Sequence, residues 1–250
     1  MTIKPFSRLL GYLQQLFLQR ISPAEIWMLL ATLLAGGGIW IFIELAEEVL
    51  QGETREIDTM ILLALRTPAD VSDPRGPLWF EETMRDVTAL GGFVLLTALS
   101  LAVVGFLLLQ KRKKMAFFLA GAVFGGYVLS SLLKHVFERP RPDLVPHQAH
   151  VMTASFPSGH SMLSAVVFLT LGGLLARYTS QKRLKLYILS LSMLTTFMVG
   201  CSRVYLGVHW PTDVLAGWTA GASWALLCWL CALLLQRRGR IEKQIENKPE

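Results

Sequence analysis

Long apolar runs separated by short polar segments dominate this sequence. A helix needs about 20 mostly apolar residues to cross the roughly 30 Å hydrocarbon core of a bilayer. Runs that reach or approach this length lie near residues 26–46, 93–110, 115–133, 159–178, 186–201 and 212–235. The pattern predicts an all-α polytopic membrane protein with about six transmembrane helices, built as a single membrane-embedded domain over residues 26–235.

The composition agrees with this class. Hydrophobic residues make up 53% of the 250 residues and charged residues only 17%, and the mean hydropathy is +0.47. A soluble domain rarely has such values. The cysteines at 201, 228 and 231 fall in or beside apolar runs, and the C-x-x-C pair at 228–231 has no histidine or second pair nearby. Packing explains these cysteines better than redox or metal chemistry.

The distribution of basic residues predicts the orientation. With the N-terminus inside, the inner segments hold 16 of the 24 lysines and arginines, including the run "KRKK" at 111–114. Short cytoplasmic loops collect positive charge, so both termini are expected in the cytoplasm and the chain in the cell inner (cytoplasmic) membrane. The net charge of +6 then reflects topology, and no nucleic-acid partner is expected.

The segments that flank the spans have their own patterns. Residues 1–25 carry leucines at helical spacing between Arg8 and Arg20, which predicts a cytoplasmic amphipathic helix on the membrane surface or a helical hairpin partner for the first span. The first span starts too late and lacks an A-x-A cleavage site, so we expect a retained anchor. Residues 236–250 read as a charged cytoplasmic tail.

The longest outer segment, 47–92, predicts two short amphipathic helices. One apolar stripe runs through 57–65 and another through 80–87, with the turn-rich break "TPADVSDPRGP" between them. Such helices could cover a site or guide a lipid into it, or they could simply pack on the membrane surface.

Three polar stretches carry the candidate chemistry: "KHVFERPRP" at 134–142, "PSGH" at 157–160 and "SRVYLGVHWPTD" at 202–213. By the predicted topology all three emerge on the extracytoplasmic side. Ser158 is placed to cap the helix that follows, which leaves the amides of Gly159 and His160 free to bind an anion. Lys134 and Arg203 arrive there at the ends of other spans, and together these groups predict a phosphate site.

Each residue also has a structural explanation. Lys134 and Arg203 could be snorkelling cations at helix ends, Ser158 only a cap, and His160 an interfacial histidine. "HWPTD" could be only a helix start with Pro211 in its first turn. Their combination in one short outer region favours the anion site, because the positive-inside rule disfavours basic residues there.

The two histidines suggest different roles. Asp213 follows His209 by four residues and can accept a hydrogen bond from one ring nitrogen, which leaves the other nitrogen as a nucleophile. His160 lies on a different helix and can act as the general acid that protonates a leaving oxygen.

These motifs resemble the three-part signature of the type 2 phosphatidic acid phosphatase (PAP2) superfamily, in its membrane lipid phosphatase branch. The matching pattern is Lys134-x6-Arg141-Pro142, then Pro157-Ser158-Gly159-His160, then Ser202-Arg203-x5-His209-x3-Asp213. It covers about 80 residues, from the third span to the start of the sixth; segments 1–92 and 236–250 lie outside it.

The resemblance implies a mechanism that needs no metal or other cofactor. By it, His209 attacks phosphorus to form a phosphohistidine, Asp213 orients His209, and His160 protonates the leaving group. The phosphoryl oxygens are held by the residues that match the rest of the signature: Lys134, Arg141, Ser158, Gly159 and Arg203. The stretch "RPRP" offers two Arg-Pro pairs, so Arg139 remains an alternative to Arg141.

A phosphate site at the membrane interface can receive a lipid phosphate whose tails stay in the bilayer. The expected substrate is therefore a lipid phosphate monoester or diphosphate, with phosphatidic acid, phosphatidylglycerol phosphate and undecaprenyl diphosphate all compatible. A lipid phosphotransferase would use the same residues and remains an alternative. A vanadium haloperoxidase shares this set of residues, but six membrane spans argue against it. An anion transporter would carry its charged residues within the spans, whereas here they gather at one interface. The sequence does not set the oligomeric state.

Overall fold

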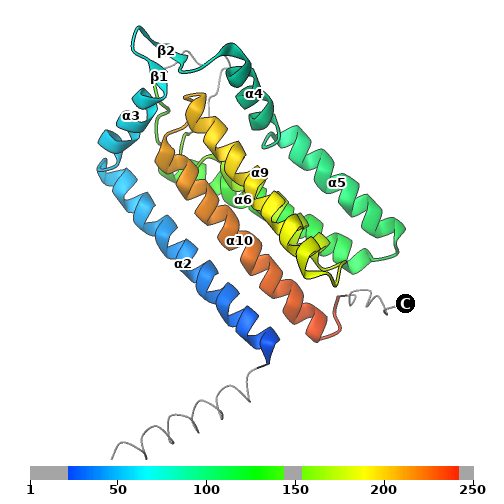
Figure 1. The fold of residues 1–250 in the computed structure, drawn as a ribbon. Helices are drawn as coiled ribbons and strands as arrows, with labels where there is room; N and C mark the ends of the chain where they lie inside the picture. Colours follow the sequence, from blue (N-terminus) through cyan, green and yellow to red (C-terminus); the bar gives the residue numbers. More distant parts are fainter. Residues whose placement is uncertain (1–21, 144–153, 242–250) are drawn as a thin grey trace, which may run out of the picture.

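The computed structural model describes residues 22–143 and 154–241, which form a bundle of long helices with a small cap at one end (Figure 1). The elements in chain order are α2 (Pro23–Gln51), α3 (Arg55–Ala64), β1 (Arg66–Thr67), β2 (Asp70–Pro74), α4 (Leu78–Ala89), α5 (Phe93–Leu109), α6 (Lys113–Phe137), α7 (Gly159–Ser164), the π-helical turn η1 (Ala165–Leu169), α8 (Thr170–Ala176), α9 (Lys182–Tyr205) and α10 (Pro211–Arg237).

The helix lengths confirm a membrane protein with five to six spans. Helices α2, α6, α9 and α10 are each long and apolar enough to cross a bilayer, as is the continuous helix made of α7, η1 and α8. Helix α5 has 17 residues and reaches the required length only together with α4, from which it is bent by 46°. The predicted span at 93–110 is therefore the lower part of a bent pair.

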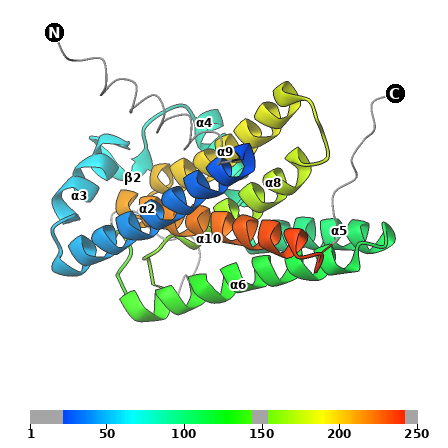
Figure 2. The ribbon, with the colours of Figure 1, turned by 90° about the horizontal axis from the view of Figure 1, so that it is seen from below.

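Contacts between distant parts of the chain close the bundle. Helix α2, the first span, packs along α10, the last, and α5 pairs with α6, as both views show (Figures 1 and 2). Helix α10 also lies against α7, where it carries glycine. A methyl group on Gly217 would lie 2.7 Å from the carbonyl oxygen of Ser158, so only glycine permits this close approach.

The fourth span contains a feature that the sequence does not predict. The expected helix over 159–178 ends at Ala176, and its residues 165–169 form a π-helical turn between α7 and α8. Single π turns of this kind occur mostly inside α-helices and near functional sites. Here the turn directly follows the segment that begins with "PSGH".

The segment 47–92 forms the cap. It contains the two predicted short helices, α3 and α4, and between them a small antiparallel β1–β2 hairpin where a turn-rich break was expected. Helix α4 packs on α9, with the ring of Phe80 edge-on to Tyr205. The buried face of helix α3 holds Asp58 together with Leu62, whereas its apolar residues Ile57 and Met60 are exposed.

The flanking predictions fall mostly on parts that are not described. Residues 1–21, most of the predicted amphipathic segment, and residues 242–250 of the predicted tail lie outside the described residues. Of the rest, Ser22 forms a capping box with Glu25 at the start of α2. At the other end, α10 runs to Arg237, and Ile241 is buried in a cluster with Leu107 and Met115.

Candidate active site

The three polar stretches meet at the end of the bundle that carries the cap. The amide of Ser158 donates to the carbonyl oxygen of Asp213 over 2.9 Å. Arg141 Nη1 lies 3.1 Å from His209 Nε2 and donates to the carbonyl oxygen of Val208 over 2.8 Å. Segments 134–142, 154–160 and 202–213 are thus joined directly by hydrogen bonds, as the sequence pattern predicts.

His209 and Asp213 form a buried pair at the start of α10. His209 precedes the helix and Asp213 lies in its first turn, so the four-residue spacing brings His209 Nδ1 to 3.3 Å from Asp213 Oδ2. The side chain of His209 is 1% exposed and that of Asp213 fully buried. Asp213 Oδ2 also accepts from the amide of Trp210 over 3.0 Å, which fixes the carboxylate against its own helix start.

The partners of His209 define its tautomer. A guanidinium can only donate, so Nε2 must accept the hydrogen bond from Arg141 and therefore carries no proton. The proton of the neutral ring is then on Nδ1, where it faces Asp213. This arrangement leaves Nε2 with the lone pair that a nucleophile requires.

Burial keeps the His209 ring neutral. Loss of solvent is the main cause that lowers the pKa of His209 to about 3; the hydrogen bond and negative charge of Asp213 partly oppose it, and the positive charges of Arg203 and Arg141 act in the same direction as burial. The ring is therefore unprotonated at neutral pH, as a nucleophilic histidine must be.

The start of α7 forms the opposite wall. Ser158 caps the helix as predicted, since its buried hydroxyl accepts from the amide of Ser161 over 3.4 Å and from the Ser161 hydroxyl over 2.9 Å. Among the described residues, no partner is recorded for the amides of Gly159 and His160. A methyl group on Gly159 would lie 3.5 Å from Lys134 Nζ, so the ammonium group sits directly at this helix end.

Two cations of the site lack a counter-charge. Within the described part of the chain, neither Lys134 nor Arg203 lies within ion-pair distance of a carboxylate. Lys134 Nζ donates to the carbonyl oxygen of Ala154 over 3.3 Å, and Arg203 Nη1 donates to Thr88 Oγ1 over 3.0 Å. The buried Nε of Arg203 has no hydrogen-bond partner. Uncompensated cations and an orphaned donor of this kind suit a bound anion.

Arg139 and Arg141 have different surroundings. The guanidinium of Arg139 lies between two buried carboxylates, with Nη2 2.7 Å from Asp58 Oδ2 and Nη1 2.6 Å from Asp213 Oδ1. It also stacks over the ring of Trp210. Arg141 instead touches the reactive nitrogen of His209. The geometry therefore favours Arg141 over Arg139 as the arginine that faces a substrate.

Sequence reasoning missed two residues of the site, Ser155 and Asp58. The hydroxyl of Ser155 donates to Asp213 Oδ2 and lies 3.3 Å from His209 Nδ1, so it supports the same carboxylate as His209. Asp58 comes from α3, more than 150 positions from Asp213. Ser155 could have been suspected from the sequence because it lies three residues before Ser158. For Asp58 the sequence offers only a carboxylate beside an apolar stripe.

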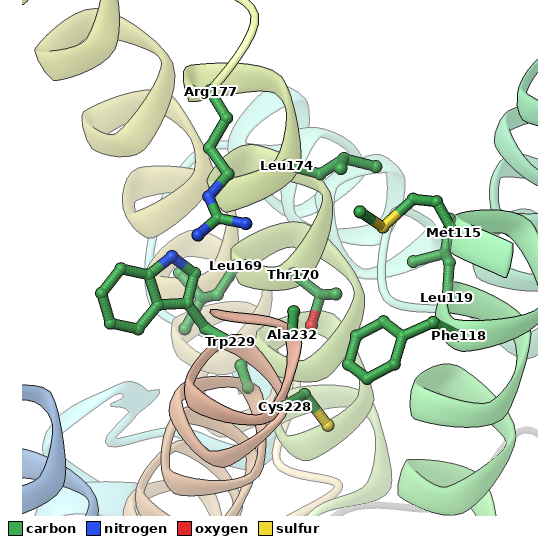
Figure 3. A pocket seen from close by; sticks show the side chains of 11 residues that line it. Met115, Phe118, Leu119, Leu169, Thr170, Leu174, Arg177, Cys228, Trp229 and Ala232 are labelled. Atoms are coloured by element: carbon green, nitrogen blue, oxygen red, sulfur yellow. The ribbon is translucent and has the colours of Figure 1, made fainter. Parts of the chain in front are cut away.

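Other parts of the described structure do not compete for this role. Within the described residues, no group of three His, Cys, Asp or Glu side chains could hold a metal ion. A small apolar pocket lies between α6, α8 and α10 near the opposite end of the bundle. In it, the guanidinium of Arg177 lies over the ring of Trp229 and Thr170 points inward (Figure 3). The lining holds no nucleophile–base pair.

The chain is similar to known phosphatases. A family model described as "PAP2 superfamily" matches residues 115–237. Phosphatidylglycerophosphatase B of Bacillus subtilis is 37% identical over 147 residues, which are 57% of this chain and 70% of that protein. Undecaprenyl-diphosphatase of Sulfolobus acidocaldarius is 32% identical over 123 residues, 47% of this chain and 55% of that protein. Lipid A 1-phosphatase of Rhizobium johnstonii is 32% identical over 130 residues, 48% of each chain.

A solved structure shares the fold. The crystal structure of a transmembrane PAP2 type phosphatidylglycerolphosphate phosphatase from Bacillus subtilis superposes with a TM-score of 0.70 at 28% identity and covers 81% of this chain and 98% of that one. The family match contains all three polar stretches, 134–142, 157–160 and 202–213. This chain belongs to the PAP2 superfamily and is a multi-pass membrane enzyme of the phosphatase type.

Proposed function

We propose that the enzyme hydrolyses a lipid phosphate monoester or diphosphate through a phosphohistidine on His209. The observation that supports this most directly is that a neutral, Asp213-oriented His209 lies in one site with Lys134 and Arg203, for which the described residues provide no carboxylate within ion-pair distance. A nucleophile and a phosphate-binding surface therefore lie side by side, which phosphoryl transfer requires.

In the first step His209 Nε2 attacks phosphorus. The P–N bond forms while the bond between phosphorus and the lipid-side oxygen breaks, and that oxygen takes a proton from His160. The ring of His209 becomes positively charged, and Asp213, which faces Nδ1 over 3.3 Å, stabilises this charge. His160 is the second residue of α7, on a different helix from His209, and lies within electrostatic range of both Lys134 and His209. In its protonated form it can therefore act as the general acid on the leaving-group side.

In the second step water attacks the phosphohistidine. His160 accepts a proton from the water, the P–N bond breaks, and inorganic phosphate and neutral His209 are released. Throughout, the phosphoryl oxygens are held by Lys134, Arg141, Arg203 and the start of α7 at Ser158 and Gly159. These fixed cations and amides supply the charge stabilisation for which other phosphatases use metal ions, so we propose a metal-independent reaction.

The substrate is proposed to be a lipid because the site lies at the ends of membrane-spanning helices. The relatives named above act on phosphatidylglycerol phosphate, on undecaprenyl diphosphate and on lipid A, and all of these place a phosphate at the bilayer surface. The exposed apolar residues of α3, Ile57 and Met60, give the cap a surface suited to contact with lipid.

We further propose that the site faces the extracytoplasmic side and that both termini are cytoplasmic. The basic run at 111–114 joins α5 to α6 at the end of the bundle opposite the site, as the positive-inside rule expects of a cytoplasmic loop. A reporter fused after Gln236 should therefore give a cytoplasmic signal, and an external signal would reverse the topology.

Phosphate release from purified enzyme in detergent tests the proposed function. Phosphatidic acid, phosphatidylglycerol phosphate, undecaprenyl diphosphate and lipid A are supplied in parallel with a chelator present, and His209→Ala is the control. Release by the wild type alone supports metal-independent hydrolysis, and the relative rates identify the preferred lipid. Consumption of a lipid diphosphate without free phosphate, accompanied by a newly phosphorylated lipid, would show a phosphotransferase instead.

A further inference from the structure

Asp58 is a buried carboxylate that lies outside the family signature. It is on α3 in the cap and is fully buried. Its oxygens accept hydrogen bonds from the amide of Thr212 over 3.0 Å, from the Thr212 hydroxyl over 2.6 Å and from Arg139 Nη2 over 2.7 Å. A carboxylate with this many donors at 0% exposure is held in one position.

These contacts place Asp58 at the N-terminus of α10, the helix that starts with the catalytic pair. Trp210 is the N-cap and Thr212 is the second residue of the helix, so Asp58 satisfies one of the amides that a helix start leaves without an intrahelical partner. The negative charge is also favourable beside the positive end of the helix dipole. Through Asp58, the segment 47–92 thereby fixes the helix turn that contains Asp213.

Arg139 connects Asp58 to Asp213. Its guanidinium binds both carboxylates, over 2.7 Å and 2.6 Å, and is itself only 11% exposed. With two carboxylates sharing one cation, the group of three keeps a net negative charge next to His209. Without Asp58, the full charge of Arg139 would fall on Asp213 and weaken the support that Asp213 gives to a positively charged His209 ring.

We propose that Asp58 is a positioning residue for catalysis: through Arg139 and Thr212 it holds Asp213 in place, and it keeps the net charge of the Asp58–Arg139–Asp213 group negative while His209 carries the phosphoryl group. This inference rests on the proposed function, because it assigns Asp58 a part in the same phosphoryl transfer. It also gives the segment 47–92 a role in the chemistry, beyond covering the site.

Burst kinetics separate positioning from mere structural support. Phosphatidic acid labelled in its phosphate is mixed in saturating excess with the enzyme, and samples are quenched in base. The rate constant of phosphoenzyme formation is then a property of each active molecule, whereas the burst amplitude counts the folded fraction. We expect Asp58→Asn, which keeps the shape and removes the charge, to lower the rate constant about tenfold with the amplitude maintained. Glu56→Gln, an exposed charge removal on the same helix, should change neither value.

A second variant tests whether the effect passes through Arg139. Arg139→Gln leaves two buried carboxylates facing each other without their cation. Its rate constant of phosphoenzyme formation should therefore be lower than that of Asp58→Asn. Adding Asp58→Asn to Arg139→Gln removes one of the two opposed charges. The rate constant of the double variant should therefore be higher than that of Arg139→Gln alone. Losses that multiply in the double variant would overturn the proposal.

The single variant also decides the proposal if Arg139→Gln yields no folded protein. A rate constant for Asp58→Asn within twofold of the wild type, with only the amplitude reduced, would show that Asp58 is purely structural. A different result would contradict the proposed function itself: the wild type would form no phosphoenzyme.

Discussion

Arg141 donates a hydrogen bond to His209 at Nε2, the ring nitrogen that points away from Asp213, over 3.1 Å. The contact fixes the tautomer and places a cation where a phosphoryl oxygen would lie when Nε2 attacks phosphorus. The same guanidinium also donates to the neighbouring carbonyl oxygen of Val208 over 2.8 Å, so it is held beside the position that this phosphoryl oxygen would take in the proposed attack.

The first prediction concerns the nucleophile. His209→Ala should lower phosphate release by at least about a thousandfold, because the substitution removes the nitrogen that is proposed to attack phosphorus. Labelled substrate should leave on the wild type a phosphoenzyme that is acid-labile and base-stable, as phosphohistidine is. Label that persisted on the His209→Ala protein would assign the covalent step to another residue.

The second prediction separates the two arginines of "RPRP". Arg141→Ala should abolish most of the activity and leave the melting temperature in detergent nearly unchanged. Arg139→Ala should destabilise the fold by about 3 kcal/mol or more, because it leaves the carboxylates of Asp58 and Asp213 buried without their cation. Thermal unfolding and phosphate release, measured on the same preparations, check both. Equal melting temperatures for the two variants would contradict the burial argument.

The third prediction follows from the lowered pKa of His209. The folded protein keeps this ring neutral down to a pKa of about 3, whereas the unfolded chain protonates it near its ordinary value of about 6.5. Between these values the unfolded state binds more protons, so stability is full above pH 6.5 and falls as the pH is lowered. From pH 6.5 to 4.5 this one group accounts for at most about 3 kcal/mol.

His209→Gln is the control for that titration. The variant lacks the group, so its melting temperature should fall less than that of the wild type between pH 7.5 and 4.5. Parallel curves for the two proteins would show that His209 does not contribute to the acid sensitivity.

The fourth prediction concerns the contact between α10 and α7. A methyl group on Gly217 would lie 2.7 Å from the carbonyl oxygen of Ser158 and 3.0 Å from Ser161 Cβ. Gly217→Ala should therefore push away the start of α7 and lower both stability and phosphate release. Gly105→Ala is the matched control, because a methyl group on this α5 glycine meets no atom within 4 Å. A Gly217→Ala protein with the melting temperature and activity of the wild type would refute the close-packing argument.

The sequence predicts those parts of this structure that have a local pattern. The apolar runs locate the spans, and the residues around Lys134, Ser158 and His209 indicate the site because each lies where a span begins or ends. The three stretches are expected on the same side of the membrane from topology alone. Consecutive spans run in opposite directions, so the end of one span and the start of the next lie on the same side.

The features that the sequence does not predict depend mainly on contacts between segments that are distant in the chain. Asp58 and Arg139 are 81 positions apart, and neither has a neighbour in sequence that reveals the pairing. On α3 the usual rule also misleads, since the apolar stripe at Ile57 and Met60 faces outward and the carboxylate faces inward. The π-helical turn at 165–169 has no distinct sequence signal either, because its residues are as apolar as the helices on both sides.

The contact between α2 and α10 determines when this enzyme can become active. Helix α2 is synthesised before α10, and α10 is the span that carries Asp213 and follows His209. Until α10 enters the membrane, α2 has no helix to pair with along its length, and Asp58 has no helix start to cap. The candidate site therefore stays incomplete until α10 has been inserted, so its geometry forms only after synthesis of that span.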